Sequence, residues 1–534
     1  MSLSPRGGVQ PQSRRVMNLA HILRQNARRF GGRPGLIWGE QAWTWRDIDA
    51  AVSALAAGLA ARGIVKGDRI LVHSKNCAQM FWSMFAAFRL GAVWVPTNFR
   101  LLPDEVAELA QASGARAFLC HGDFPRHAQA VMAACPALDF VWRIGDGDLG
   151  ADNVARIVAT HAGADVADAA VDHDDPCWFF FTSGTTGRSK AAVLTHGQMA
   201  FVITNHIADL MPGLGEADMS LVVAPLSHGA GIHQLVQCAR GAASILMPTE
   251  RFDIDEAFRL ISHYRVTNIF TVPTILKMLV EHPAVDRHDH SSLRHIIYAG
   301  APMYREDQKT ALKKLGPVLV QYFGLGEVTG NITVLPAALH NAQDGPQARI
   351  GTCGFARTGM QVAIQDDAGA ELPALQTGEI CVIGPAVFAG YYDNTQANEK
   401  AFRNGWFRTG DLGHIDAQGF LFITGRSSDM YISGGSNIYP REIEEKLLAH
   451  PAIAEAAVLG WPDPAWGESG VAVCVLRDGF TLGETELAQF LAERIARYKM
   501  PKRFVFWDAL PKSGYGKVPK RLVRDELLAR GGLP

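Results

Sequence analysis

The first part of the chain alternates between apolar segments with helical spacing and short apolar runs typical of buried strands. Helices are predicted over residues 48–62 and 80–90. Strands are predicted over residues 70–72, 93–95, 116–120, 220–224, 243–247 and 268–271. Gly91 is expected to end the second helix, and Pro96 to break the strand before it. The alternation predicts parallel α/β sheets, in which phosphate sites commonly lie at the carboxyl ends of strands.

From about residue 345 the pattern changes, because glycines now separate short strand-like runs such as 361–365 and 379–383. This pattern indicates a small antiparallel β unit over about 345–425. The polar residues 425–429 are interpreted as a linker. After it, a helix over 439–450, strands over 453–459 and 471–476 and a helix over 484–496 are predicted. They form a compact α+β tail, so the expected domains are residues 1–427 and 428–534.

Composition narrows the classes of protein that fit this pattern. The chain has 534 residues, 48% hydrophobic and 19% charged, which is typical of a folded globular protein with at least two domains. Its 51 Lys and Arg nearly balance 53 Asp and Glu, so no overall field favours nucleic acid. The eight cysteines show no paired or metal-like spacing, which favours a reduced, cytoplasmic protein. Neither a secretory signal nor an apolar run long enough to span a membrane is expected.

The segment from Thr182 to Lys190, TSGTTGRSK, combines hydroxyls, glycines and cations directly after the strand-like run 177–181. Backbone N–H groups at such a strand exit can turn toward an anion, and this composition suits a polyphosphate. The spacing differs from the Walker pattern, so an ordinary P-loop fold is not implied. Taken alone, a flexible surface turn remains an alternative for this segment.

Three further constellations carry possible chemistry. Residues 321–327, QYFGLGE, combine aromatic side chains, glycines and a carboxylate, a set that suits a stacked base and Mg²⁺. Asp411 is expected after a turn, where its carboxylate could accept hydrogen bonds from both hydroxyls of a ribose. The guanidinium group of Arg426, further along the chain, adds hydrogen-bond donors. Residues 511–517, PKSGYGK, place Lys517 on a glycine-rich loop. Each has a simpler explanation as a turn or a solvated charge, and the sequence 286–290, DRHDH, is more simply a solvated loop than a metal site.

Together these residues resemble the adenylate-forming superfamily of acyl-CoA synthetases, nonribosomal-peptide adenylation domains and luciferases. The resemblance spans roughly residues 19–528, and its motifs occur in the expected order. They are residues 182–190, 225–228, 299–302 with 324–327, 409–411 with Arg426, and 511–517. It implies an α/β fold with a large N-terminal domain of two parallel α/β sheets and a small β-barrel-like unit. A small α+β C-terminal domain, mobile about a hinge, follows.

The resemblance also implies a two-step reaction. A carboxylate attacks the α-phosphate of MgATP to give an acyl-adenylate and pyrophosphate, and a thiol then attacks the activated carbonyl. Lys517 would bridge the carboxylate and the α-phosphate, Glu327 would ligate Mg²⁺, and His228 would stand between the acid and the nucleotide. The residues implied to bind the nucleotide are Thr182, Ser183, Gly184, Thr185, Thr186, Gly187, Lys190, Gly300, Ala301, Pro302, Phe323, Gly324, Asp411 and Arg426.

The acid and CoA sites follow from the same resemblance. The implied acid pocket comprises, besides His228, the residues Gly229, Gly231, Tyr298, Ala299, Tyr322 and Leu325. The implied hinge and CoA tunnel comprise Ser428, Asp429, Ser433, Gly434 and Gly435. The pocket is mostly apolar or small and has no arginine to pair a second carboxylate, which favours a medium-chain aliphatic or an aromatic monocarboxylic acid. CoA is favoured as acceptor, because no aspartate follows Pro225 to grip an amino acid's ammonium group.

Three positions depart from the family pattern. Gly326 stands where a threonine commonly contacts the α-phosphate, with Phe323 in place of a tyrosine. Ser428 stands at the hinge where Asp or Lys is usual, and Tyr515 stands where small polar residues are commoner.

None of these departures removes a charge that the chemistry requires, so the prediction is an acid–CoA ligase that uses ATP, Mg²⁺ and CoA. Two alternatives stay open: a ligase that loads a separate carrier protein, and a non-catalytic nucleotide sensor. Small molecules are the expected partners, and a homodimer is left open.

Overall fold

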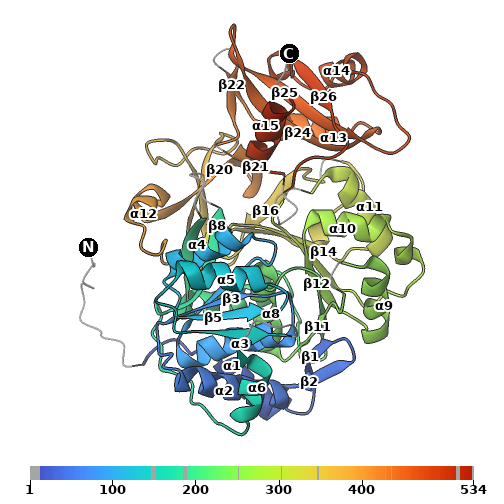
Figure 1. The fold of residues 1–534 in the computed structure, drawn as a ribbon. Helices are drawn as coiled ribbons and strands as arrows, with labels where there is room; N and C mark the ends of the chain where they lie inside the picture. Colours follow the sequence, from blue (N-terminus) through green and yellow to red (C-terminus); the bar gives the residue numbers. More distant parts are fainter. Residues whose placement is uncertain are drawn as a thin grey trace.

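The computed structural model describes residues 13–145, 152–183, 189–249, 252–301, 303–345, 348–426, 428–433, 436–512 and 518–531, with only the backbone of 183 and 437. Three sheets organise the chain, two in a large N-terminal part and one in a small C-terminal part (Figure 1). The expected fold class is confirmed: parallel α/β sheets make up most of the large part, and an α+β unit closes the chain.

The first sheet has the strand order β7-β6-β5-β3-β4-β8-β9 and is parallel except for the pairing of β8 with β9. Its strands are β3 (Arg69–His73), β4 (Val93–Thr97), β5 (Ala117–His121), β6 (Phe140–Ile144), β7 (Asp152–Asn153), β8 (Pro176–Ser183) and β9 (Ser189–Thr195). Its helices are α1 (His21–Arg29), α2 (Trp45–Ala61), α3 (Ala78–Leu90), α4 (Pro103–Ser113), α5 (Pro125–Ala134) and α6 (Val154–Thr160). Residues of α2 and α3 belong to one hydrophobic cluster, and residues of α4 and α5 to another.

Gly91 and Pro96 test the boundaries expected here. Gly91 ends α3 in the left-handed conformation, with φ of 67°, as predicted. Pro96 does not break the strand, because β4 continues through it to Thr97 in register with Val72 and His73 of β3. The fixed φ of proline is compatible with a strand, and its missing N–H costs little near a strand end.

The second sheet has the order β17-β18-β20-β21-β16-β15-β14-β13-β12-β10-β11-β1-β2, with β19 paired to β20. Its strands are β1 (Pro34–Trp38), β2 (Gln41–Thr44), β10 (Met219–Val222), β11 (Ala243–Leu246), β12 (Asn268–Thr271), β13 (His295–Tyr298), β14 (Leu319–Phe323), β15 (Thr333–Leu335), β16 (Thr352–Ala356), β17 (Gln361–Gln365), β18 (Gly378–Ile383), β19 (Phe402–Arg403), β20 (Trp406–Ile415) and β21 (Phe420–Arg426). The antiparallel unit expected near 345–425 is therefore continuous with this sheet, since β16 pairs with β15 and β15 with β14.

Six α-helices and three short 3₁₀ turns accompany this sheet among the described residues. They are α7 (His196–Asp209), α8 (Gly229–Arg240), α9 (Ile254–Tyr264), α10 (Pro273–Glu281), α11 (Arg305–Leu315), α12 (Thr395–Ala401), η1 (Pro283–Asp286), η2 (Gly326–Val328) and η3 (Ala337–Leu339). Helices α9, α10 and α11 lie together at one side of the molecule (Figure 1).

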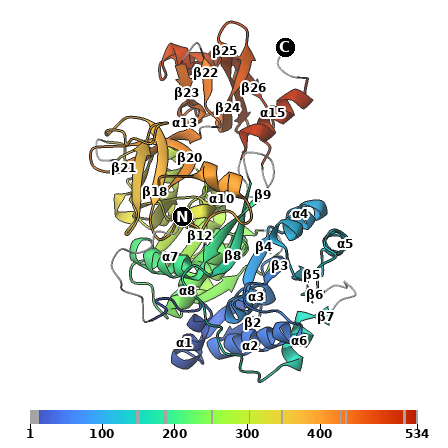
Figure 2. The same ribbon diagram turned by 90° about the vertical axis from the view of Figure 1, so that its left-hand side faces the viewer.

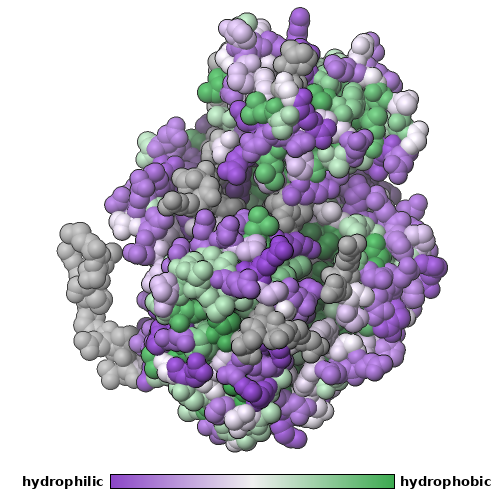
Figure 3. All heavy atoms as spheres, in the orientation of Figure 1, coloured by the Kyte–Doolittle hydropathy of each residue, from purple (hydrophilic) through white to green (hydrophobic). Residues whose placement is uncertain are grey.

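The C-terminal part holds the third sheet, of order β23-β22-β25-β24 with β26 paired to β25. Its elements are β22 (Tyr431–Ser433), β23 (Ser436–Ile438), α13 (Pro440–Leu448), β24 (Ile453–Asp463), β25 (Gly467–Leu476), α14 (Glu484–Ala492), η4 (Arg497–Lys499), β26 (Arg503–Phe506) and α15 (Lys520–Ala529). This part stands on top of the larger one, and the face in Figure 3 is hollowed between the two. The chain passes from the second sheet to the third between Arg426 and Tyr431.

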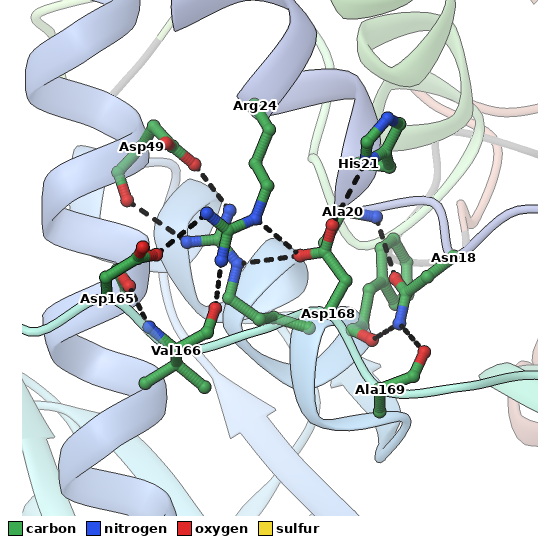
Figure 4. Close-up of polar contacts among 12 residues, drawn as sticks. Asn18, Ala20, His21, Arg24, Asp49, Asp165, Val166, Asp168 and Ala169 are labelled. Atoms are coloured by element: carbon green, nitrogen blue, oxygen red, sulfur yellow. Dashed lines mark hydrogen bonds and ion pairs between the residues drawn. The ribbon is translucent and has the colours of Figure 1, made fainter.

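A buried charge network fixes the segment that leads into β8 (Figure 4). Arg89, whose side chain is fully buried, pairs with Asp49 and with Asp168, and Arg24 also pairs with Asp168. The Asn18 amide donates to the Ala169 carbonyl at 3.1 Å. Helices α1, α2 and α3 thereby hold one connecting segment, so β8 starts from a fixed position.

The eight cysteines are buried and free, as expected of a chain with scattered thiols. Within the described residues, no helix combines the length and apolar character needed to cross a membrane.

Candidate functional site

The segment from Thr182 to Lys190 begins at the end of strand β8 and ends at the start of strand β9, and these two strands form a β-hairpin. Strands β8 and β9 pair antiparallel, with Thr182 opposite Lys190 and Ser183 opposite Ser189. The end of the hairpin at which β8 finishes and β9 starts is directed toward the C-terminal domain (Figure 2). Gly184, Thr185, Thr186 and Gly187 lie outside the described residues. The pairing places the Thr182 hydroxyl and the Lys190 ammonium group on adjacent strands, next to the segment predicted to hold phosphates.

Glu327 lies at the base of this hairpin. It sits in η2, directly after β14, and only 5% of it is exposed. Its Oε1 accepts hydrogen bonds from the Thr182 hydroxyl at 3.0 Å and from the Tyr391 hydroxyl at 2.9 Å. No donor among the described residues contacts Oε2. A buried carboxylate with one oxygen engaged and a hydroxyl beside it offers the hard oxygen ligands that Mg²⁺ prefers.

Tyr391 was not predicted from the sequence. Desolvation, together with the nearby charge of Glu327, raises the pKa of Tyr391 far above the usual value, so its hydroxyl stays protonated and donates. The Lys190 Nζ lies 5.1 Å from the centre of the Tyr391 ring, and Tyr391 bridges to Ala192 of β9. The ring therefore connects the hairpin lysine to the Glu327 carboxylate. No motif marks this tyrosine, because it meets β9 only through the fold.

Two neighbouring strand ends supply the residues predicted to hold adenine. Strands β13 and β14 are adjacent and parallel, so Gly300 and Ala301 follow one strand end while Phe323 and Gly324 lie at the other. At Gly324, an added Cβ would lie 2.4 Å from the Cα of Gly330, so the backbone approaches too closely for a side chain. Pro302 lies outside the described residues.

Asp411 and Arg426 face each other across two strands. They are register partners in β20 and β21, and the Arg426 Nε lies 2.9 Å from Asp411 Oδ1. Asp411 is buried, whereas the Arg426 side chain is half exposed. The expectation that Asp411 follows a turn is wrong, because it lies inside β20, whose hydrogen bonding continues past Gly410 to Ile415. The pairing orients the carboxylate and the guanidinium as one unit.

His228 lies where helix α8 begins. It occupies the N-cap position, and its Nδ1 lies 2.9 Å from the Ser227 hydroxyl oxygen. Its ring and the ring of Phe180 of β8 pack in a T-shaped arrangement, with centroids 5.1 Å apart. The first residue of α8, Gly229, has space only for hydrogen: an added Cβ would lie 2.7 Å from Phe270 Cζ and 3.6 Å from the Tyr322 hydroxyl. The predicted acid pocket thus has an aromatic wall behind the start of α8.

The predicted acid-pocket residues divide between two environments. Tyr322, Ala299 and Leu325 belong to or pack against one hydrophobic cluster, and Gly231 packs closely on Trp178 of that cluster. Tyr298 lies in a different cluster with residues of α11, and is fully buried. Its hydroxyl interacts with Gln321, Gln308 and His340 at 3.0 to 3.2 Å. The structure therefore does not bring Tyr298 together with Tyr322.

The described residues of the predicted hinge and CoA tunnel lie at the start of the C-terminal part. The Ser428 hydroxyl donates to Asp429 at 3.2 Å, and the Asp429 N–H donates to the Arg426 carbonyl at 3.0 Å. Ser433 ends β22, in a hairpin on the side of the C-terminal domain away from the large domain (Figures 1 and 2). Gly434, Gly435 and Lys517 lie outside the described residues.

The histidine-rich loop at 286–290 is engaged elsewhere. Asp286 pairs with Lys314, and Arg287 pairs with Asp255 at 2.6 Å. No cluster of metal-ligating side chains occurs in the part of the chain that the structure describes.

Comparison with known proteins agrees with this geometry. Residues 23–392 match the family described as AMP-binding enzyme, and residues 442–517 match the AMP-binding enzyme C-terminal domain. The chain is 36% identical to a feruloyl-CoA synthase of Amycolatopsis sp, over 91% of this chain and 94% of that protein. It is 34% identical to an indoleacetate–CoA ligase of Aromatoleum aromaticum, over 96% and 99% of the two chains. An amide bond synthetase from Marinactinospora thermotolerans superposes with a TM-score of 0.86 at 25% identity, covering 95% of this chain and 99% of that one.

Proposed function

Because the chain belongs to the AMP-binding enzyme family, we propose that it joins an aromatic carboxylic acid to CoA through an acyl-adenylate. The observation that carries the substrate class is the aromatic wall at the start of α8. Phe270 and Tyr322 are stacked, with an interplanar angle of 17° and centroids 6.1 Å apart, and both approach Gly229. Flat aromatic rings in the wall of an acid pocket suit a flat acyl group. The two relatives named for feruloyl and indoleacetate substrates support the same class.

The nucleotide roles follow from the site's charges and donors. Thr182, Lys190 and the segment between them would hold the β- and γ-phosphates, and Phe323 would pack against adenine. Glu327, with the Thr182 hydroxyl beside it, would hold Mg²⁺, which when bound neutralises phosphate charge. Lys517 would bring positive charge to the α-phosphate, where the acid's carboxylate attacks. His228 would separate the acid from the nucleotide.

A screen of pyrophosphate release with and without CoA tests the proposal. The acids are cinnamic, arylacetic and benzoic acids and straight-chain acids of increasing length, and mass spectrometry identifies the product. We expect kcat/KM to be about tenfold or more higher for the best aryl acid than for any aliphatic acid, and the aryl thioester to form only with CoA. A preference for aliphatic acids would refute the substrate class. In a further arm, an amine replaces CoA: amide without any thioester would instead assign the chemistry of the amide bond synthetase.

The Asp411→Asn variant tests the ribose assignment. The substitution preserves the size of the side chain but removes the negative charge, which orients Arg426 and strengthens hydrogen bonds from the ribose hydroxyls. We therefore expect the KM for ATP to rise about tenfold or more, with a smaller change in kcat. Steady-state kinetics with ATP and with 2′,3′-dideoxy-ATP measure it. The wild type should discriminate strongly between these nucleotides and the variant weakly. If the variant only lowers the melting temperature, Asp411 acts through the fold alone.

A further inference from the structure

Phe180 occupies a position in the site that no sequence motif indicated. It lies on β8 two residues before Thr182, so the two side chains leave the strand on the same face. Its ring is only partly buried and makes a T-shaped contact with the His228 ring, with centroids 5.1 Å apart. One predicted catalytic residue therefore borders this ring directly.

Gly326 borders the same ring from another side. A Cβ built on Gly326 would lie 2.6 Å from both Cδ1 and Cε1 of Phe180 and 3.1 Å from Cγ2 of Thr182. The φ of Gly326 is not positive, so its backbone conformation does not require glycine. The Phe180 ring, with Thr182 Cγ2 beside it, leaves no room for a side chain at 326. The residue that follows, Glu327, carries the carboxylate that accepts from Thr182.

We propose that Phe180 is a positioning residue for adenylate formation, seated on Gly326, whose ring sets the spacing between His228 and Glu327. This inference rests on the proposed function, because both residues have their assigned roles there. The ring touches the segments that carry both residues: η2, through Gly326, and the beginning of α8. It thereby fills the space that a side chain at 326 would take and holds the two segments apart.

The arrangement makes positions 180 and 326 interdependent. A methyl group at 326 must either push the ring toward His228 or move η2 away from β8. The second movement would lengthen the 3.0 Å hydrogen bond between Thr182 and Glu327. A smaller side chain at 180 relieves both, because Phe180→Leu removes about the volume that Gly326→Ala adds.

The experiment compares Gly326→Ala, Phe180→Leu and the double variant in acid-dependent pyrophosphate release with the best aryl acid. We expect Gly326→Ala to lower kcat about tenfold or more, and Phe180→Leu to lower it only a few-fold. The double variant should return to within about threefold of the wild type. Gly215→Ala is the control glycine substitution, since nothing lies within 4 Å of a Cβ there and its φ is also not positive.

Melting temperatures separate positioning from folding, because a purely structural effect would change activity only in proportion to stability, in both single variants and in the double variant. A double variant no more active than Gly326→Ala overturns the inference, as does a Gly326→Ala variant with unchanged kcat. The wild type keeps the two proposals distinct. Its failure to release pyrophosphate with any acid refutes the proposed function, whereas an active wild type without coupling refutes only the role of Phe180.

Discussion

Replacing Lys517 by alanine is expected to lower acid-dependent pyrophosphate release by about 10²- to 10³-fold or more, while largely sparing thioester formation from a preformed aryl-adenylate. The first step brings two anions together, and removing one ammonium group leaves the charge on the α-phosphate uncompensated. The second step starts from a neutral carbonyl, which no longer needs this charge. Rapid-quench assays with acid plus ATP, and with synthetic adenylate plus CoA, measure the two steps separately.

Lys512→Ala provides the matched control for this prediction. Lys512 belongs to the same sequence segment and loses the same charge, but its Nζ pairs with Glu455 at 2.9 Å within the C-terminal domain. A partly exposed pair of this kind contributes about 1 kcal/mol or less, so both steps should stay within about threefold of the wild type. Equal losses in the two steps of Lys517→Ala would contradict its role at the α-phosphate.

The helices and strands predicted from local sequence signals each overlap an observed element, because those signals act over a few residues. The run 268–271 coincides with β12, and Gly91 ends α3 as its freedom to adopt positive φ suggests. The exceptions arose where pairing between strands overrides local preference. Pro96 lies within β4 because β3 pairs alongside it, and Asp411 lies in a strand because Arg426 faces it from β21.

The candidate site was predictable where one short segment carries the chemistry. Thr182, Glu327 and Asp411 each stand in a recognisable run, although the sequence did not show that Thr182 and Glu327 share a hydrogen bond. Tyr391 and Phe180 gave no such signal. One reaches Glu327 only because its segment bridges to β9, and the other reaches Gly326 only because η2 folds against β8. Contacts between segments far apart in the chain depend on the assembled sheets, which no local pattern encodes.

Replacing Glu327 by glutamine should separate the metal role of this residue from its structural role. The amide keeps the size of the side chain, and the Thr182 and Tyr391 hydroxyls can still donate to its oxygen, so the melting temperature should change by only a few degrees. The lost charge should raise the Mg²⁺ concentration that gives half-maximal activity about tenfold or more and lower kcat about 10²-fold. Titration of Mg²⁺ at saturating ATP measures both.

The control for this substitution is Glu256→Gln, which makes the same change on the outer helix α9, where Glu256 pairs with Arg259 at 2.6 Å. Its Mg²⁺ dependence should match that of the wild type. An unchanged Mg²⁺ dependence in Glu327→Gln, with lower kcat, would assign this carboxylate to the alignment of Thr182 and Tyr391 instead of the metal. A large loss of stability would show that burial of a charged carboxylate, paired with two hydroxyls, is what the fold requires at this position.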